Sequence, residues 1–328
     1  MFGKTHGTAA RTKQLLFAAA LAAATALVTR RRALKAETEH PPTGRFIDVA
    51  GVRLHFLERG RGTPVVLLHG NGALAQDFRG SGVFDRLAAH YRVVAFDRPG
   101  YGFSKRPRDR TWTPEAQAEL LTSAFERLGI EHPVVVGHSW GTLVALALGL
   151  EHPDRVRGLL LLSGYYYPSL RPDVFLFAPA AIPVLGDAMR YTVSPLVGKL
   201  LVPGLLREMF APLPVPDRFR TAVPQSLMLR PSQLRASAAE SALMIPAAAR
   251  LRKRYAGLRV PLNLIAGADD RIAHVERHSA RLHKEVPGSD LQVLPGLGHM
   301  LHYFAQDAVV EAVNALAPPV AAIGDLPA

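Results

Sequence analysis

Short runs of apolar and β-branched residues recur along most of the chain, and each run is closed by Gly, Pro or Asp. Runs of this length and composition predict buried β-strands. The first two runs meet at Ala50-Gly51, which indicates a hairpin. Eight strands are expected, over Phe46–Val49, Val52–Leu57, Val65–Leu68, Val93–Phe96, Val134–Val136, Leu159–Leu162, Leu262–Ala266 and Leu291–Leu294.

Stretches that read as helices lie between the later strands. Thr113 and Pro114 supply an N-cap followed by proline at the first helical position. Near-continuous apolar strands that alternate with helices predict an α/β fold, in which a mainly parallel sheet is covered on both faces. Four helices are expected, over Pro114–Leu128, Thr142–Leu150, His274–Val286 and Ala305–Leu316.

Residues 165–255 interrupt this alternation. They hold twelve of the 26 prolines and four of the six methionines, and they are rich in apolar residues without a strand pattern. This composition predicts a helical insertion. Open α/β sheets keep their sites at the carboxyl ends of strands, where this insertion begins, so we expect a lid over the active site. The alternative is an insertion with a purely structural role. The expected organisation is an N-terminal segment (1–40), the core (41–164), the cap (165–255) and the rest of the core (256–328).

The N-terminal segment contains an uncharged apolar run, Leu15–Val28, between Lys13 and Arg30. The run predicts a single membrane anchor, although at about 1.5 Å per residue it is short for a hydrocarbon core of about 30 Å. One alternative is an exported protein whose signal peptide is cleaved near Ala24–Ala26. The run of arginines at Arg30–Arg32 opposes translocation and favours the anchor. A further alternative is an alanine-rich surface helix.

The formal net charge of +12 lies in two segments, +5 in residues 1–40 and +7 in residues 165–255. Neither segment interleaves basic residues with aromatic ones, so we expect no nucleic-acid partner. The charge of the cap could hold it against anionic lipid and let it draw acyl substrates from the bilayer. The alternative is that the charge keeps an apolar lid soluble. The chain has no cysteine, which excludes disulfides, a thiol nucleophile and thiolate metal sites.

Ser139 is the candidate nucleophile. The strand Val134–Val136 leads into Gly137-His138-Ser139-Trp140-Gly141, and a helix rich in Ala and Leu follows. A Gly-x-Ser-x-Gly motif in this setting forms a tight turn in which the serine backbone is strained and the two glycines relieve crowding. The turn exposes the hydroxyl at a helix N-terminus, which favours developing negative charge. The alternative, a serine in an ordinary turn, does not require this strand–turn–helix context.

A serine nucleophile needs a base, and the base needs an orienting carboxylate. The strand Leu262–Ala266 runs into a loop that carries Asp269 and Asp270, and a later strand end delivers His299. The order Ser, Asp, His along the chain is that of the α/β hydrolases. From about Arg45 to Leu316 the sequence therefore resembles the α/β-hydrolase family, with a helical cap, and the resemblance implies an eight-stranded sheet.

The resemblance also implies roles for individual residues. The acid of the family is usually the last residue of Gly-x-x-Asp, which matches Asp270 and leaves Asp269 as a solvated neighbour. The base follows a Gly-x-Gly turn near the C-terminus, which matches His299, with His302 and His278 as the rivals.

Two backbone N–H groups are expected to bind the oxyanion of an acyl-transfer intermediate. One belongs to Trp140, directly after the nucleophile. By resemblance, the other belongs to Asn71 in the loop His69-Gly70-Asn71-Gly72, where His69 is expected to be a structural clamp. The segment Asp97–Ser104 also matches the family, and we expect it to brace the neighbouring loops.

Asn71 and Trp140 also resemble the residues that hold the leaving halide in haloalkane dehalogenases. Those enzymes use an aspartate where this chain has Ser139. An alkylated aspartate is an ester that water can open, whereas an alkylated serine is a stable ether. Dehalogenase and epoxide hydrolase reactions are therefore disfavoured. A Ser-Trp-Gly turn is compatible with peptidases and C–C bond hydrolases, and the loop lacks the three glycines of one lipase and esterase group.

These observations predict a serine hydrolase that acts through an acyl-enzyme on ester-like, small to medium apolar substrates. The alternatives with the same triad are a C–C bond hydrolase, a peptidase or an acyltransferase. A non-catalytic binding protein on this scaffold is a further alternative. We expect no cofactor and no metal, because no His/Asp/Glu cluster has ligand spacing and the short Gly-x-Gly runs lack a phosphate-binding fingerprint. The expected partners are an acyl substrate and, through residues 1–40, membrane lipid.

Overall fold

One eight-stranded sheet forms the centre of the molecule. The computed structural model describes residues 5–169 and 178–318 of the chain. The strand order is β1-β2-β4-β3-β5-β6-β7-β8, antiparallel at β1 and β2 and parallel from β4 to β8. All eight predicted strands are confirmed, as β1 (Arg45–Val49), β2 (Val52–Arg59), β3 (Pro64–Leu68), β4 (Arg92–Phe96), β5 (Val134–His138), β6 (Gly158–Leu162), β7 (Leu262–Gly267) and β8 (Asp290–Leu294).

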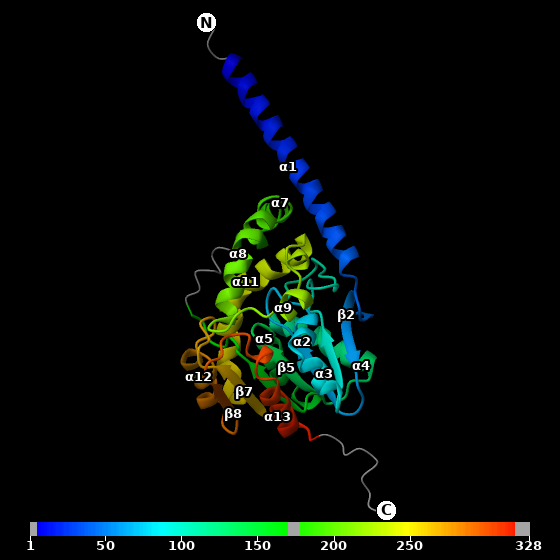
Figure 1. Ribbon diagram of the computed structural model, residues 1–328, viewed down its shortest axis with the longest axis vertical. Coiled ribbons are helices and arrows are strands. Elements are labelled where there is room, and N and C mark those ends of the chain that lie inside the picture. The colour runs from blue at the N-terminus through cyan, green and yellow to red at the C-terminus, as the bar shows by residue number, and fades with distance from the viewer. Residues whose placement is uncertain (1–4, 170–177, 319–328) are drawn as a thin grey trace, which may run out of the picture.

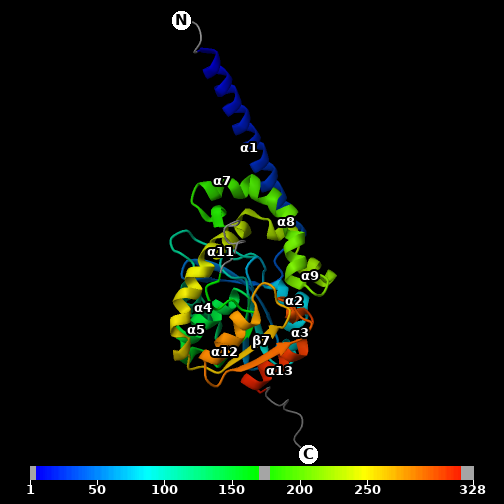
Figure 2. The same ribbon diagram turned by 90° about the vertical axis from the view of Figure 1, so that its left-hand side faces the viewer.

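Helices cover both faces of this sheet, as Figures 1 and 2 show. The central strands β3, β5 and β6 are apolar on both sides, so each face needs a cover. One face packs against α4 (Pro114–Leu128), α5 (Gly141–Glu151) and α12 (Ser279–Glu285). The other packs against α2 (Gln76–Ser81), α3 (Val83–Ala88) and α13 (Gln306–Leu316). Single 3-10 turns follow α5, precede α12 and precede α13, at η1 (Pro153–Arg155), η4 (Val275–Arg277) and η5 (Leu301–Tyr303).

The helical predictions differ from the structure at two places. The single helix expected over His274–Val286 is divided into η4 and α12, because the backbone leaves the helical conformation at His278. The ring Nδ1 atom of His278 accepts the N–H groups of Tyr166 and Tyr167, which holds this break in place. The short helices α2 and α3 were not predicted, since each spans fewer than two turns and Gly82 in the left-handed region separates them.

The described part of the chain between β6 and β7 is helical, and we call it the cap. No strand occurs in its described residues, as the sequence predicted, while residues 170–177 lie outside the description. The residue limits set for the cap and the other domains remain predictions. The cap comprises η2 (Ala178–Ala181), α7 (Leu185–Tyr191), α8 (Val193–Phe210), α9 (Asp217–Ala222), α10 (Gln225–Met228), α11 (Pro231–Leu251) and η3 (Arg252–Gly257).

The N-terminal segment forms one long helix, α1 (Thr5–Glu39), that projects from the globular part (Figure 1). Its last turns pack against the cap through Ala36, and Glu37 forms an ion pair of 2.8 Å with Arg230. By length and composition, α1 is the one helix in the described residues that could cross a membrane, and signal sequences share these features. The short segment from His40 to Gly44 then leads into β1, in the manner expected of a linker.

A buried ion pair fastens the cap to the core. Glu240 of α11 and Arg98, which follows β4, are both fully buried, and the guanidinium contacts both carboxylate oxygens. The Tyr101 hydroxyl lies 2.7 Å from Oε2 of Glu240, and the Gln117 amide donates to Oε1 at 3.1 Å. Burial removes water from both ions, and this desolvation is costly. The ion pair is stable only because additional hydrogen bonds satisfy the remaining polar atoms of both side chains.

We expect Glu240→Gln to destabilise the protein strongly. Removing the carboxylate charge leaves the Arg98 guanidinium buried without a counter-ion, which costs about 3–5 kcal/mol. The matched control is Glu208→Gln, because Glu208 forms an exposed ion pair of 3.7 Å with Arg271 and its loss should cost less than about 0.5 kcal/mol. Denaturant midpoints measure both variants. Equal midpoints for the two would contradict the account of the cap.

Candidate active site

The structure brings Ser139, His299 and Asp270 together at the carboxyl ends of their strands. Ser139 follows β5, Asp270 follows β7 and His299 follows β8. The Ser139 hydroxyl lies 2.9 Å from Nε2 of His299, and Nδ1 of His299 lies 2.9 Å from Oδ2 of Asp270. An aspartate that accepts from Nδ1 fixes the imidazole so that Nε2 can accept the serine proton. This chain of hydrogen bonds is the arrangement needed to activate the serine oxygen.

Ser139 lies in a turn that leaves no room for side chains on either side. Its φ is 52°, in the left-handed region, and its N–H donates to the Leu162 carbonyl at 3.0 Å. A Cβ atom at Gly137 would lie 2.7 Å from the Gly141 oxygen, and one at Gly141 would lie 2.2 Å from the Leu68 oxygen. Both glycines are therefore required for the turn to pack between β3 and α5, as the motif predicted.

The surroundings of Asp270 keep it ionised. Burial alone would raise its pKa, but the charge and the hydrogen bond of His299 and the N–H groups of Ala273 and Ile272 outweigh burial. Both N–H groups donate to Oδ1 at 2.8 Å. The pKa of Asp270 is therefore lowered from its ordinary value, and the carboxylate is available to stabilise an imidazolium at His299.

The rival residues lie elsewhere in the structure. Asp269 is exposed to solvent, whereas Asp270 is buried and faces His299. His302 lies 3.1 Å from Asp77 through its Nε2 atom, and His278 receives the backbone N–H groups of the tyrosines after β6. Of these histidines, only His299 contacts Ser139 in the described hydrogen bonds.

The two N–H groups expected to bind an oxyanion lie beside Ser139. Trp140 directly follows Ser139 and precedes α5. The Asn71 loop packs against Ser139, since a Cβ at Gly70 would lie 3.0 Å from the Ser139 Cβ. The backbone N–H groups of Asn71 and Trp140 donate to no other described residue. Arg98 braces this loop, because its Nε donates to the His69 carbonyl at 2.8 Å and its Nη2 to the Gly70 carbonyl at 3.1 Å.

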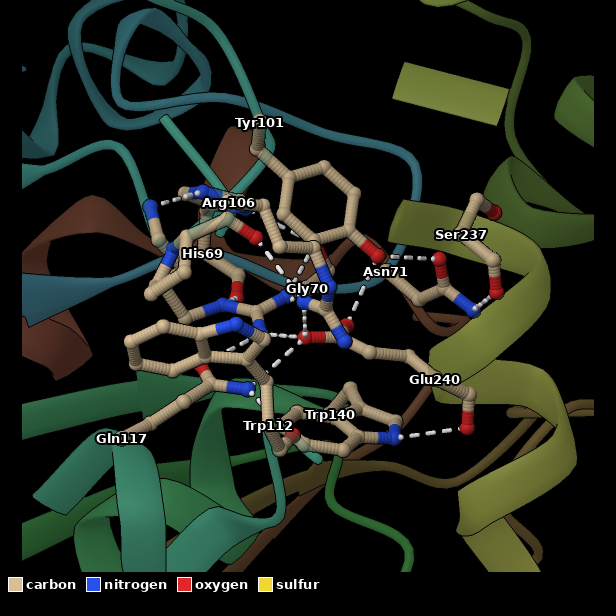
Figure 3. Close-up of polar contacts among 12 residues, drawn as sticks. His69, Gly70, Asn71, Tyr101, Arg106, Trp112, Gln117, Trp140, Ser237 and Glu240 are labelled. Carbon is tan, nitrogen blue, oxygen red and sulfur yellow. Dashed lines mark hydrogen bonds and ion pairs between the residues drawn. The ribbon is translucent and has the colours of Figure 1, made fainter. Parts of the chain in front are cut away.

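The side chains of Asn71 and Trp140 are bound to cap helix α11 (Figure 3). The Asn71 amide donates to the Ser241 hydroxyl at 3.1 Å and to the Ser237 carbonyl at 3.3 Å. The Trp140 indole N–H donates to the Glu240 carbonyl at 3.2 Å. The resemblance to haloalkane dehalogenases implied a halide-binding role for these side chains, but here both donors attach the cap.

His69 acts as a clamp within this loop. Its Nε2 accepts the Arg98 backbone N–H at 3.0 Å, so Nδ1 carries the proton and donates to the Gly70 carbonyl at 2.8 Å. Burial and the charge of Arg98 lower the pKa of His69 to about 4. The imidazole is therefore neutral at physiological pH and stabilises the loop, as the sequence predicted.

A second buried cluster lies behind His299. Asp77, His138 and His302 place one potential ligand atom each within 4.8 Å of one another, the one such group found among the described residues. One ring nitrogen of each histidine is engaged, since His302 Nε2 contacts Asp77 and His138 Nε2 donates to the His299 carbonyl at 3.1 Å. The Nδ1 atoms of His138 and His302 are buried without a hydrogen-bond partner among the described residues. The Tyr303 hydroxyl also donates to Asp77 at 2.9 Å. These bonds tie the His299 loop to α2 and so position the His299 imidazole.

Sequence reasoning missed Glu240 and Asp77. Glu240 lies in a stripe of buried residues of α11, between Ala236 and Met244 at spacings of four. An acid within an otherwise apolar helical stripe is buried when the helix packs and then needs a partner. The periodicity of α11 could therefore have predicted a buried, paired carboxylate at Glu240. Asp77 lies in a six-residue helix with no such pattern, and nothing in the local sequence marks it.

The neutral state of His69 makes stability depend on pH. Its pKa is about 4 in the folded chain and about 6.5 in the unfolded chain, so the unfolded state binds more protons between these values. This pKa difference corresponds to about 3 kcal/mol in the free energy of unfolding. The stability is fully present above about pH 6.5 and is lost progressively as the pH falls to about 4. His138 acts in the same direction because burial lowers its pKa well below the usual range.

We therefore expect His69→Gln to lose less stability than the wild type between about pH 7 and pH 4.5. Guanidinium denaturation at a series of pH values measures the difference. Parallel curves for the two proteins would show that His69 does not titrate on unfolding.

Comparison with known proteins gives the family of the chain. The family model described as alpha/beta hydrolase fold matches residues 63–306, which include all five residues of the candidate site. A 2-hydroxymuconate semialdehyde hydrolase of Pseudomonas putida is 38% identical over 131 residues, 40% of this chain and 46% of that protein. Haloalkane dehalogenase 2 of Mycobacterium tuberculosis is 29% identical over 130 residues, 40% of this chain and 45% of that protein. The chain thus spans about half the length of these curated relatives.

A solved structure described as a membrane phospholipase A, a bacterial virulence factor, shares the fold over most of the chain. Its TM-score is 0.65 at 20% identity, and the match covers 94% of both chains. The resemblance inferred from Ser139, Asp270 and His299 and their strands is confirmed at the level of the fold and the family. The chain belongs to the α/β-hydrolase family.

Proposed function

We propose that the protein is a serine hydrolase that cleaves ester-like acyl substrates through an acyl-enzyme. The observation that carries this proposal is the continuous chain of hydrogen bonds from Ser139 through His299 to Asp270. A buried carboxylate, an imidazole and a half-buried serine hydroxyl in this order are the parts that acyl transfer requires. Family relatives include hydrolases, which is consistent with the proposal.

The reaction follows from this geometry in two halves. His299 Nε2 takes the Ser139 proton as the serine oxygen attacks the substrate carbonyl, and Asp270 stabilises the imidazolium. The N–H groups of Asn71 and Trp140 hold the oxyanion. His299 then gives the proton to the departing alcohol, which leaves an ester on Ser139. Water, deprotonated by His299, then attacks this ester. As the second intermediate collapses, His299 returns the proton to the Ser139 oxygen, which restores the hydroxyl and releases the acid.

C–C bond hydrolysis is the second candidate. It is favoured by the similarity to the 2-hydroxymuconate semialdehyde hydrolase of Pseudomonas putida. The same Ser139, His299 and Asp270 would act on a carbonyl whose leaving group is carbon. Dehalogenation is disfavoured, because Ser139 would form a stable ether and because Asn71 and Trp140 use their side chains to hold the cap.

We also propose that α1 anchors the protein in a membrane. The support is the exposed apolar stretch Leu15–Val28, followed by Arg30–Arg32. A membrane phospholipase A with the same fold, matched over 94% of both chains, agrees with a lipid environment. Export with cleavage of this segment is the alternative, and the N-terminal sequence of the mature protein distinguishes the two.

We expect Ser139→Ala to abolish hydrolysis of p-nitrophenyl esters from acetate to palmitate. Without the hydroxyl no acyl-enzyme forms, so kcat should fall about a thousandfold or more. The matched control is Ser163→Ala, because Ser163 directly follows the neighbouring strand β6 with a similar φ of 46° and its hydroxyl has no partner among the described residues. Release of p-nitrophenol measures both variants.

Retention of ester turnover in Ser139→Ala would refute the mechanism. If the folded wild type hydrolyses no ester of the series, 2-hydroxymuconate semialdehyde is the next substrate to assay. Cleavage of that compound, lost in Ser139→Ala, would support the C–C hydrolase in place of the esterase.

A further inference from the structure

The apolar stretch of α1 runs alongside the cap before it ends. Thr25 and Ala26 are half-buried, and Thr29 is only 8% exposed, although the residues before them are open to solvent. The neighbours of α1 in the globular part are chiefly α7 and α10. Ala36 shares an apolar cluster with Leu227 of α10, so the lower turns contact α10. The C-terminal end of the apolar stretch therefore lies beside the cap, and the apolar stretch does not project from the globular part over its full length.

The cap exposes a group of apolar side chains at this end of the molecule. Figures 1 and 2 place α7 and the start of α8 at the end of the globular part from which α1 projects. Val193, Leu196 and Leu200 are spaced to share one face of α8. We call the following residues, each at least half exposed, the cap apex: Ile182, Val184, Leu185, Val193, Leu196 and Leu200. Several exposed apolar side chains on neighbouring helices are typical of an interaction surface.

Helix length places the cap apex near the depth of a bilayer surface. The stretch Leu15–Val28 rises about 20 Å, whereas a hydrocarbon core is about 30 Å thick. A bilayer centred on the stretch would then extend about 5 Å beyond each end. On the body side this distance reaches Thr29 to Arg31, a turn of α1 in which Thr29 is already buried and the arginines are exposed.

The charges around the cap apex suit an anionic surface. Arg30–Arg32 and Lys199 are exposed, and each can reach lipid phosphates along its apolar stem. The acidic residue of α7, Asp187, is neutralised by ion pairs with Arg108 and Arg190. The described cap residues 178–255 carry eleven Lys/Arg against four Asp/Glu. Exposed basic residues on α1 and α8 would therefore meet negative lipid headgroups beside the cap apex.

We propose that the cap apex docks into the boundary between headgroups and acyl chains of the phospholipid bilayer that α1 enters. The inference rests on the anchoring part of the proposed function. A bilayer is the occupant because the cap apex lies beside α1 at the depth where lipid begins. Docking holds the cap against the source of apolar substrates and gives its exposed residues a lipid environment.

Site-specific fluorescence quenching tests the proposal on the full-length protein. The chain has no cysteine, so each single-cysteine variant carries one label. Leu185→Cys and Leu196→Cys report on the cap apex. Ala19→Cys reports on the apolar stretch of α1, and Val293→Cys on β8 is an exposed aliphatic control at the other end of the molecule (Figure 1). The proteins are placed, one copy per disc, in nanodiscs that contain phosphatidylglycerol and lipids with a doxyl quencher near the headgroup.

We expect quenching and a blue shift of emission for the labels at positions 185 and 196 and neither for the label at 293. Unquenched labels at positions 185 and 196 would overturn the docking. Quenching of the label at position 19 in that experiment would show that α1 still enters the bilayer, whereas no quenching there would show that the proposed anchor fails as well. A blue shift that occurs only at high protein density, without lipid quenching, would mean that a second copy covers the surface. That result would also overturn the proposal.

A functional comparison separates docking from catalysis. The double variant Leu185→Asp/Leu196→Asp places two charges on the cap apex, away from Ser139, His299 and Asp270. We expect turnover of a fluorogenic ester phospholipid in phosphatidylglycerol vesicles to fall about tenfold or more, since burial of one aliphatic side chain already shifts an equilibrium by about that factor. Hydrolysis of soluble p-nitrophenyl acetate should not change. Equal turnover of the vesicle substrate by the variant and by Val293→Asp would contradict the proposal.

Discussion

The close approach of the Ser139 turn to the end of β3 is the constraint on which the site depends. The turn is possible only because Gly137 and Gly141 lack side chains where backbone oxygens lie closer than a Cβ atom allows. This approach places the hydroxyl at the start of α5 and brings the Asn71 loop against it. The parallel order of β5, β7 and β8 brings Asp270 and His299 to the same edge of the sheet. The Asn71 loop, Asp270 and His299 are thus all positioned relative to this one tight turn.

The cap is part of this site and not a separate cover. Glu240 binds Arg98, and Arg98 in turn binds the carbonyl groups of the loop that precedes Asn71. The same helix accepts the indole N–H of Trp140 and the amide of Asn71. At the other side, the Met300 N–H donates to the Met209 carbonyl at the end of α8. The cap therefore holds both the loop of Asn71 and the loop of His299.

The sequence was sufficient where local pattern and chain order determine the structure. The eight strands follow from apolar runs, and the neighbourhood of Ser139, Asp270 and His299 follows from motifs that end those strands. It was insufficient where the partner is distant and the local pattern is weak. Arg98 and Glu240 lie 142 positions apart, and Asp77 and His302 lie 225 apart. Such pairs depend on how the cap and α2 pack, which the periodicity of either segment does not specify.

The measurement that tests the central claim most directly is the mass of the protein during turnover. A slowly hydrolysed ester is mixed with the enzyme, the reaction is quenched in acid within one turnover, and the intact mass and its peptides are determined. The account predicts a gain equal to the acyl group, located on the peptide that contains Ser139. Product formation with no mass gain, or with the acyl group on another residue, would contradict it.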